Sequence, residues 1–277
     1  MVYDTSGMSS RYRASFLALG LAAVLLAGLL WMRREDLSLL GELEVSWPLM
    51  IGAISLTVVG TILSFVRWYL LVKAQGLPFT IFDSLRLCLI GTFFNFLIPG
   101  AVGGDLVKAA LMAREQERMI LSISTIVVDR VVGLLGLLIL TGVLAIGTWS
   151  SLQASQPLAE LARWNLMMLG LASAALLAFL IWPWPLEKLV DKVRKVPAMG
   201  PLLAPVVEAG ASYQSTKVVV LGCVARGVLI QALCVGALIL GGLSIWPEIP
   251  PLSSYMVAIP FGLLSTAIPL TPGGRGI

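Results

Sequence analysis

Charged side chains inside otherwise apolar stretches are the residues of this sequence whose types and spacing could do chemistry. Placing a charge in hydrocarbon is costly, so such residues are candidates for function. Cations outnumber anions among them, and a guanidinium group matches phosphate oxygens in a two-pronged hydrogen-bonded fork. These residues therefore predict a site for a phosphate-bearing group. They are Arg86, Asp105, Lys108, Asp129, Arg130 and Arg226.

The segment around Asp105 predicts a helix that begins beside this site. Asp105 follows Gly103-Gly104 and precedes residues that favour a helix, so we expect it to be the N-cap residue. A helix N-terminus of this kind presents free backbone N–H groups to an anion. Asp105 itself would repel a phosphate. It would instead cap the helix, pair with Arg130 or Lys108, or bind an amine.

Several of these polar residues also have a purely structural interpretation. Asp129 and Arg130 could form internal ion pairs with a neighbouring helix. Asn95 could make an interhelical hydrogen bond instead of contacting a substrate. Arg67 and Lys73 lie near the end of an apolar run and are expected to extend their charged groups to a membrane interface.

The composition places the chain in a lipid bilayer. It has 277 residues, of which 58% are hydrophobic and 12% are charged, so it has about half the usual charge of a soluble domain. Histidine is absent, which excludes Ser-His-Asp catalysis and histidine-ligated zinc. The three cysteines are too few for a disulfide framework. The net charge of +4 is typical of basic cytoplasmic loops, not of nucleic-acid binding, and no cofactor is expected.

Apolar runs of about 20 residues define the elements that position the charges. Five runs predict full transmembrane helices: Ala14–Met32, Trp47–Val66, Ile120–Thr148, Asn165–Trp182 and Val218–Trp246. Two other apolar stretches, 84–98 and 252–268, each end in a helix-breaking cluster. The first cluster contains Pro99, Gly103 and Gly104, and the second contains Pro269, Pro272, Gly273 and Gly274. Broken backbone inside a membrane must face protein or a wet cavity. The expected fold is therefore an all-α polytopic membrane protein with about five full transmembrane helices and two re-entrant broken helices.

The two breaks indicate an internal repeat. Ile98-Pro99 and Gly103-Gly104 recur 170 positions later as Ile268-Pro269 and Gly273-Gly274. We predict a single integral membrane domain over 1–277, with one repeat at 47–104 and a second at 218–277. Inverted repeats with broken helices are typical of secondary transporters, whose binding site lies near the midplane between the breaks.

Lysine and arginine counts give the expected topology. The segments 67–83, 105–119 and 183–216 are basic and should be cytoplasmic, whereas 150–164 and 244–251 should be external. The first repeat would then insert its broken helix from the cytoplasm and the second from outside. The first apolar run is expected to be an uncleaved anchor, with the N-terminus in the cytoplasm of a cell-membrane protein.

Three motifs in order resemble one known family, the lysylphosphatidylglycerol synthase transmembrane region, also called the flippase-like domain family. The first joins Arg67-Trp68 to Gly91-Thr-Phe-Phe-Asn95 and then to Pro99-Gly-Ala-Val-Gly103-Gly104-Asp105-Leu-Val-Lys108. The second is Asp129-Arg130-Val-Val-Gly133, and the third is Ile268-Pro269-Leu-Thr-Pro272-Gly273-Gly274. The resemblance covers the chain from about Trp47. It implies re-entrant helices around a lipid-accessible cavity and, since relatives continue past the third motif, a second half that extends beyond Ile277.

The resemblance also gives an expected function. In the full synthases this region is thought to move aminoacylated phosphatidylglycerol between leaflets, and some archaeal relatives are linked to polyprenyl-linked glycans. The leading hypothesis is therefore a non-enzymatic lipid translocator. Its partners would be an anionic or aminoacylated phospholipid or a polyprenyl-phosphate glycan, and a separate lipid or glycan biosynthesis enzyme. The alternatives are a lipid-phosphate transferase or hydrolase that uses Asp105 or Asp129 as base, and a non-catalytic membrane partner of a synthase.

Overall fold

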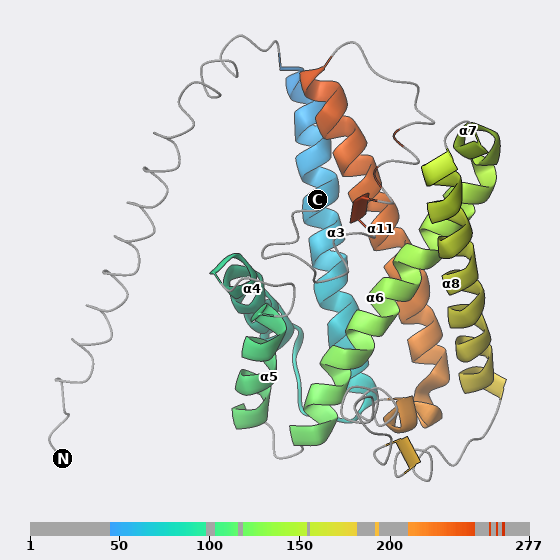
Figure 1. Ribbon diagram of the computed structural model, residues 1–277. Coiled ribbons are helices and arrows are strands. Elements are labelled where there is room, and N and C mark those ends of the chain that lie inside the picture. The colour runs from blue at the N-terminus through green and yellow to red at the C-terminus, as the bar shows by residue number, and fades with distance from the viewer. Residues whose placement is uncertain are drawn as a thin grey trace, which may run out of the picture. The chain divides into compact units, whose positions relative to one another are not determined.

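The computed structural model (Figure 1) describes residues 45–97, 103–115, 119–153, 156–181, 192–193, 210–246, 255, 259 and 262–263. The chain divides into two units, Met1–Ser46 and Trp47–Ile277, and all the helices named here belong to the second. These helices are α3 (Trp47–Ala74), α4 (Ile81–Leu97), α5 (Gly103–Glu115), α6 (Met119–Gly147), α7 (Trp149–Gln153), α8 (Gln156–Ile181), the 3-10 helix η1 (Gln214–Thr216) and α11 (Lys217–Ile245).

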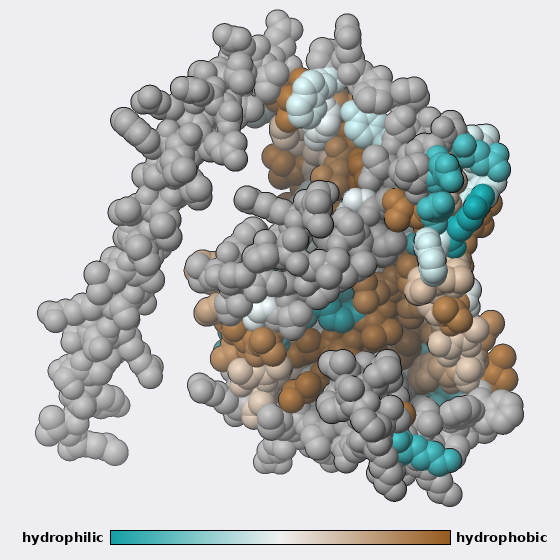
Figure 2. Space-filling view, viewed as in Figure 1, coloured by the Kyte–Doolittle hydropathy of each residue, from teal (hydrophilic) through white to brown (hydrophobic). Residues whose placement is uncertain are grey.

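Four of the helices are long and apolar enough to cross a membrane. These candidate spans are Trp47–Ala74, Ser122–Gly147, Ala159–Ile181 and Gln214–Ile245. Their outward surfaces are apolar as well, since Ile51 is 61% exposed and Leu171 is 61% exposed. On the face shown in Figure 2, hydrophobic side chains cover the middle of the described helices, and a small hydrophilic patch lies among them. Apolar surface of this extent is stable in lipid and not in water, so the fold is that of an all-α membrane protein.

Helices α3 and α11 pack against each other in antiparallel directions along their lengths. Gly52 of α3 lies against Leu240 of α11, whereas Gly60, further along α3, lies against Leu233, earlier in α11. Small residues let two membrane helices approach closely, and van der Waals contact then stabilises the pair. The α3–α11 pair forms the framework on which α4 and α6 pack (Figure 1).

Helix α6 crosses this pair at a second close contact. A Cβ atom added to Gly136 of α6 would lie 2.5 Å from the backbone carbon of Gly227 in α11, so neither helix has room for a side chain at the crossing. On another face of α6, the buried Asn165 of α8 donates from Nδ2 to Thr141 Oγ1 at 2.7 Å. Helix α6 therefore joins α8 to the α3–α11 pair.

Helices α4 and α5 form a hairpin that begins and ends at the same end of the bundle. The end of α3 lies beside the start of α6, as the hydrogen bond from Trp68 Nε1 to Thr125 Oγ1 at 3.3 Å shows. The chain leaves α3 at this end, passes through α4 and α5, and continues into α6 from the same end (Figure 1). A hairpin of this form agrees with the expected re-entrant segment. Insertion of the hairpin into a membrane stays a prediction.

The start of α4 is fixed by a capping box. Asp83 Oδ2 accepts hydrogen bonds from Thr80 N at 2.9 Å and from Thr80 Oγ1 at 2.6 Å, while the Asp83 N–H donates to Thr80 Oγ1 at 3.2 Å. The hydrogen bonds from Thr80 hold the pKa of the Asp83 carboxyl below its usual value. One residue later, Ser84 Oγ donates to the backbone oxygen of Phe65 in α3 at 2.8 Å. The base of the hairpin is therefore tied both to itself and to α3.

The expected fold class is confirmed, and four of the five predicted runs are long helices. The first run, 14–32, and the second broken helix, 252–268 with its Pro-Gly-Gly cluster, lie outside the described residues apart from 255, 259 and 262–263. The inverted repeat therefore stays a prediction. Two boundaries were wrong. Helix α3 continues through Arg67 to Ala74, and α8 begins at Gln156 within the predicted external loop.

The early start of α8 has a local cause. Ala159 and Ala162, at 6% and 0% exposure, form a small buried face on its first turns. Ala162 packs in a cluster with Ala145 of α6 and Leu152 of α7. Burial of this face stabilises the helix, although the sequence, with the exposed charges of Glu160 and Arg163, is not apolar enough to be recognised as part of a span.

Candidate functional site

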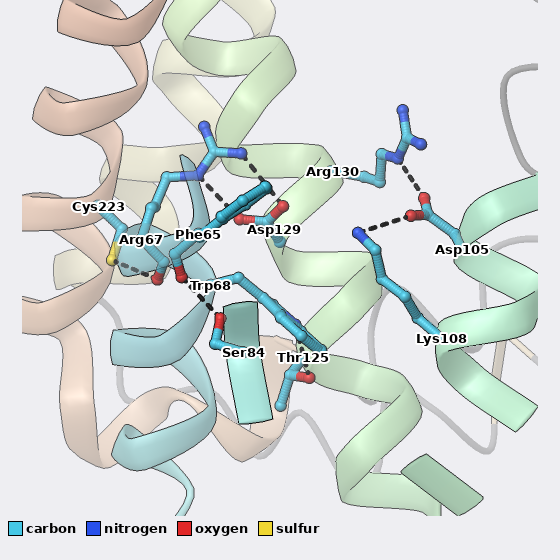
Figure 3. Close-up of polar contacts among 10 residues, drawn as sticks. All are labelled: Phe65, Arg67, Trp68, Ser84, Asp105, Lys108, Thr125, Asp129, Arg130 and Cys223. Carbon is cyan, nitrogen blue, oxygen red and sulfur yellow. Dashed lines mark hydrogen bonds and ion pairs between the residues drawn. The ribbon is translucent and has the colours of Figure 1, made fainter. Parts of the chain in front are cut away.

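Two neighbouring residues of α6, Asp129 and Arg130, face different helices and make different ion pairs (Figure 3). Asp129 accepts two hydrogen bonds from Arg67 of α3, from Nε at 2.8 Å and from Nη2 at 3.1 Å. Arg130 donates from Nε to Oδ2 of Asp105 on α5. Consecutive helical residues point about 100° apart, so α6 holds a carboxylate toward α3 and a guanidinium toward α5.

The Arg67–Asp129 pair is buried at the junction of three helices. The side chains of Arg67 and Asp129 are 7% and 17% exposed. The guanidinium of Arg67 lies against Gly133 of α6 and Gly227 of α11, where added Cβ atoms would come within 3.4 and 3.5 Å of its nitrogens. Both carboxylate oxygens accept from the guanidinium fork, so each charge is compensated. This pair links α3 to α6 and is structural. The prediction that Arg67 extends to a membrane interface is wrong.

Asp105 is shared by two cations. Its Oδ2 accepts from Arg130, and its Oδ1 lies 3.3 Å from Nζ of Lys108, one turn later on the same helix. The Asp105 side chain is 10% exposed, whereas that of Arg130 is 49% exposed. Asp105 is the third residue of α5, so it lies in the first turn, where a negative charge is stabilised by the helix dipole. The predicted pairing with Arg130 or Lys108 involves both. The prediction that Asp105 is the N-cap is wrong.

Lys108 reaches across the hairpin to α3. Its stem passes over Gly91 of α4, where an added Cβ would lie 2.5 Å from Lys108 Cε. Its ammonium lies 5.4 Å from the centre of the Trp68 ring, a cation–π distance. The Trp68 ring is fixed in turn by Thr125 and by an edge-to-face contact with Phe79, at 5.3 Å between ring centres. The position of the lysine charge is therefore set by α3 and α4 as well as by α5.

The two arms of the hairpin cross where both are glycine. A Cβ added to Gly104 would lie 2.0 Å from the backbone oxygen of Gly91, so only glycine fits. Asn95 Oδ1 accepts a hydrogen bond from the Gly104 N–H at 2.7 Å, which confirms the interhelical interpretation of Asn95. The Gly104 N–H at the start of α5 is therefore occupied by a side chain of α4, contrary to the expectation that it is free for an anion.

Among the described residues, the charges of the two ion-paired groups around α6 sum to +1, and the second group is partly accessible from outside. Arg67 and Asp129 neutralise each other, and Asp105 faces two cations, Lys108 and Arg130. The more exposed side chain of the second group is the guanidinium of Arg130. A half-exposed guanidinium whose carboxylate partner can be exchanged is suited to bind the oxygens of a phosphate group.

The structure brings together six of the residues that were predicted for the site. They are Asn95, Gly104, Asp105, Lys108, Asp129 and Arg130, with Gly103 buried at the start of α5. Arg86 is exposed on α4, and Arg226 is exposed on α11 and donates from Nη1 to Gly222 O of its own helix at 3.1 Å. Pro99, Pro272, Gly273 and Gly274 lie outside the described residues, so their roles stay predictions.

Arg67 and Trp68 are parts of the site that were not predicted as such. A signal was available, because Asp129 in an apolar run needs a cation on a neighbouring helix. Arg67 is 62 positions earlier in the chain, however, and this separation hides the pairing. The Arg67-Trp68 dipeptide did belong to the first motif of the resemblance. Its place in that motif was therefore a better guide than its position near the end of a run.

Comparison with known proteins identifies the family of the chain. Neither the curated proteins nor the solved structures gave a match. A family model described as "Lysylphosphatidylglycerol synthase TM region" matches residues 15–277, which is nearly the whole chain. The chain therefore belongs to the family of the lysylphosphatidylglycerol synthase transmembrane region.

Proposed function

We propose that this protein is a lipid translocator of the cell membrane, in which Arg130 binds the phosphate of a lipid headgroup. Family membership supports a lipid-related role in a membrane. The observation that carries the proposal is the half-exposed guanidinium of Arg130, held by a shared carboxylate at the side of a helical hairpin among apolar surfaces. The headgroup would pass along this polar network while the lipid tails stay among the exposed apolar side chains.

The chemistry defines a class of substrate. Anionic phospholipids, aminoacylated phospholipids and polyprenyl-phosphate glycans all present a phosphate to a guanidinium. The network of Arg67, Lys108 and Arg130 with Asp105 and Asp129 has a net charge of +1, which favours a headgroup with net negative charge. An amine on an aminoacylated headgroup would be bound by Asp105. In this proposal the protein breaks no bond in the lipid, and a separate enzyme supplies the substrate.

Proteoliposomes test the proposal directly. The chain is reconstituted into vesicles that contain phosphatidylglycerol labelled on the headgroup side with a nitrobenzoxadiazole dye, and dithionite is added outside. Dithionite bleaches outer-leaflet dye only, so loss of the protected fraction measures translocation. In vesicles with the parent protein, we expect dithionite to bleach the protected fraction as the labelled lipid reaches the outer leaflet. We expect Arg130→Ala to slow translocation by about tenfold or more, because a hydrogen bond to a charged group contributes ~1.5–3 kcal/mol.

The matched control is Arg163→Ala, since Arg163 is an exposed arginine of α8 that takes no part in the network. This variant should translocate at the rate of the parent. Equal rates for Arg130→Ala and Arg163→Ala would contradict the assignment of the site. No translocation by the folded parent would contradict the function itself. Appearance of a chemically modified lipid in the vesicles would favour the transferase alternative.

A further inference from the structure

We propose that the α4–α5 hairpin is a gate, that the Asp105–Arg130 ion pair is its latch, and that Lys108 is the counter-ion which allows the latch to open. The phosphate of a lipid headgroup with net negative charge opens it by replacing Asp105 on the guanidinium of Arg130. The ligand in this inference rests on the proposed function, whereas the mechanical part rests on the contacts of the hairpin itself.

The two ion pairs of α6 differ in burial, so that the contact of α6 with α3 is fixed and its contact with α5 can open. Arg67–Asp129 is bidentate, buried and enclosed by the glycines of α6 and α11. Arg130 reaches Asp105 with a side chain that is 49% exposed, so a ligand can approach it. Breaking the first pair would leave uncompensated charge in the core, which is costly. Breaking the second pair exposes a guanidinium that is already half accessible.

The hairpin is anchored at its base and latched further along. At the base, Ser84 binds the Phe65 backbone, and a buried apolar cluster joins α3, α4, α5 and α6. This cluster consists of Phe65, Trp68, Val72, Leu77, Phe79, Leu87, Cys88, Met112 and Ile126. Asp105, in the first turn of α5, lies towards the opposite end of that helix from Met112. Loss of the latch would therefore free the start of α5 while the base of the hairpin stays packed.

Lys108 removes the main electrostatic obstacle to this movement. Asp105 is 10% exposed, so it would carry an uncompensated charge when Arg130 leaves it for a phosphate. The ammonium of Lys108 is already 3.3 Å from Asp105 Oδ1, and both residues belong to α5. The carboxylate keeps one counter-charge when α5 separates from α6. Arg130 likewise exchanges one anionic partner for another, so each charge is compensated in both states.

Distances between spin labels measure the gate in the whole chain. Leu106→Cys on α5 and Leu134→Cys on α6 place labels on the two helices that the latch joins, at positions that are 63% and 43% exposed. The contact between α5 and α6 is called the seam here, and these two labels form the seam pair. Lys73→Cys and Phe82→Cys, both exposed, report on the base of the hairpin. Both pairs are built in a background with Cys88, Cys223 and Cys234 changed to Ala. The chain is then compared in nanodiscs of phosphatidylcholine and of phosphatidylglycerol.

The gate predicts a specific pattern of distances. The seam pair should gain a longer-distance population in phosphatidylglycerol, while the base pair stays unchanged. Arg130→Gln should show the longer distance in both lipids. Lys108→Gln should reduce the longer-distance population by about tenfold in phosphatidylglycerol, the shift that ~1.4 kcal/mol produces in a two-state equilibrium. Lys108→Arg, which keeps the counter-charge, should restore it.

Two results would overturn the inference: the same seam distance in both lipids for the folded parent, or opening by Lys108→Gln equal to that of the parent. Lys108 and its variants keep the test decisive if Arg130→Gln does not fold. Lipid translocation with a seam that never opens would reject the gate and leave the proposed function intact. A seam that opens in phosphatidylglycerol without translocation would support the gate and reject the proposed function.

Discussion

Asp129 and Arg130 show how two adjacent charges in one apolar helix can have separate tasks. Asp129 is bound on both oxygens by Arg67 and holds α3 to α6, whereas Arg130 reaches α5 and remains half exposed. Their charges could be recognised from the sequence as candidates, because charges in apolar runs are costly. The pairing of Arg130 with Asp105 was one of the alternatives predicted for Asp105, whereas the pairing of Asp129 with Arg67, 62 positions earlier, was not predicted. Only packing of the helices decides which charge meets which.

The Arg67–Asp129 pair should dominate the stability of the α3–α6 contact. We expect Arg67→Met to lower the free energy of unfolding by about 3–5 kcal/mol, because Asp129 would then be a buried charge without a partner. The double variant Arg67→Met with Asp129→Leu should regain part of this loss, since two apolar side chains of similar size replace the pair. Thermal unfolding in detergent, followed by intrinsic fluorescence, measures the three proteins.

Lys73→Met is the control for this prediction, because Lys73 is an exposed cation of the same helix. It should leave the unfolding temperature close to that of the parent. A double variant as unstable as Arg67→Met would contradict the view that the uncompensated charge causes the loss.

Among the elements, the hairpin shows most clearly what the sequence could and could not predict. The Pro-Gly-rich break after the apolar stretch 84–98 predicted a broken helix, and α4 and α5 flank that break. The sequence did not show that Gly91 and Gly104 are placed at one crossing, 13 positions apart, or that Asn95 binds the Gly104 N–H. Similarly, the predicted loop before α8 is helical because buried alanines stabilise it. Interhelical contacts of this kind leave little trace in local composition.

A methyl group at position 104 should separate the arms of the hairpin. Its carbon would lie 2.0 Å from Gly91 O, so we expect Gly104→Ala to cost about 1–3 kcal/mol of stability and to break the Asn95 hydrogen bond. Hydrogen exchange of the α4 and α5 amides, measured by mass spectrometry, should become faster than in the parent.

Gly170→Ala is the matched control, since nothing lies within 4 Å of a Cβ atom at Gly170 of α8. Alanine favours a helix more than glycine, so this variant should be neutral or slightly stabilising. Faster hydrogen exchange in α4 and α5 for Gly170→Ala would contradict the crossing. An exchange rate equal to that of the parent for Gly104→Ala would contradict it as well.

For the whole molecule, composition alone established a membrane protein, and the four described candidate spans agree with it. The antiparallel packing of α3 and α11 was not predicted by itself, but it is the arrangement that an inverted repeat requires of its two leading helices. Repetition of a short Pro-Gly pattern in the sequence cannot show how two halves are oriented, because orientation depends on the membrane side from which each half inserts.

The expected topology gives a prediction at this scale. Ser150, between α6 and α8, and Ser215, before α11, are exposed at opposite ends of α8. In the background without native cysteines, Ser150→Cys should react with a membrane-impermeant maleimide in intact cells, because segment 150–164 is expected outside. Ser215→Cys should react only after the cells are permeabilised. Labelling of both, or of Ser215→Cys alone, in intact cells would contradict the topology.

The placement of Asp129 directly before Arg130 has a consequence for any change in the length of α6. Each added residue rotates everything after it by about 100° around the helix axis. One residue inserted between the two would leave Asp129 facing α3 while turning the guanidinium away from Asp105. The angular phase of α6 at this point is therefore fixed by two partners at once, and whole-turn insertions of three or four residues would preserve it best.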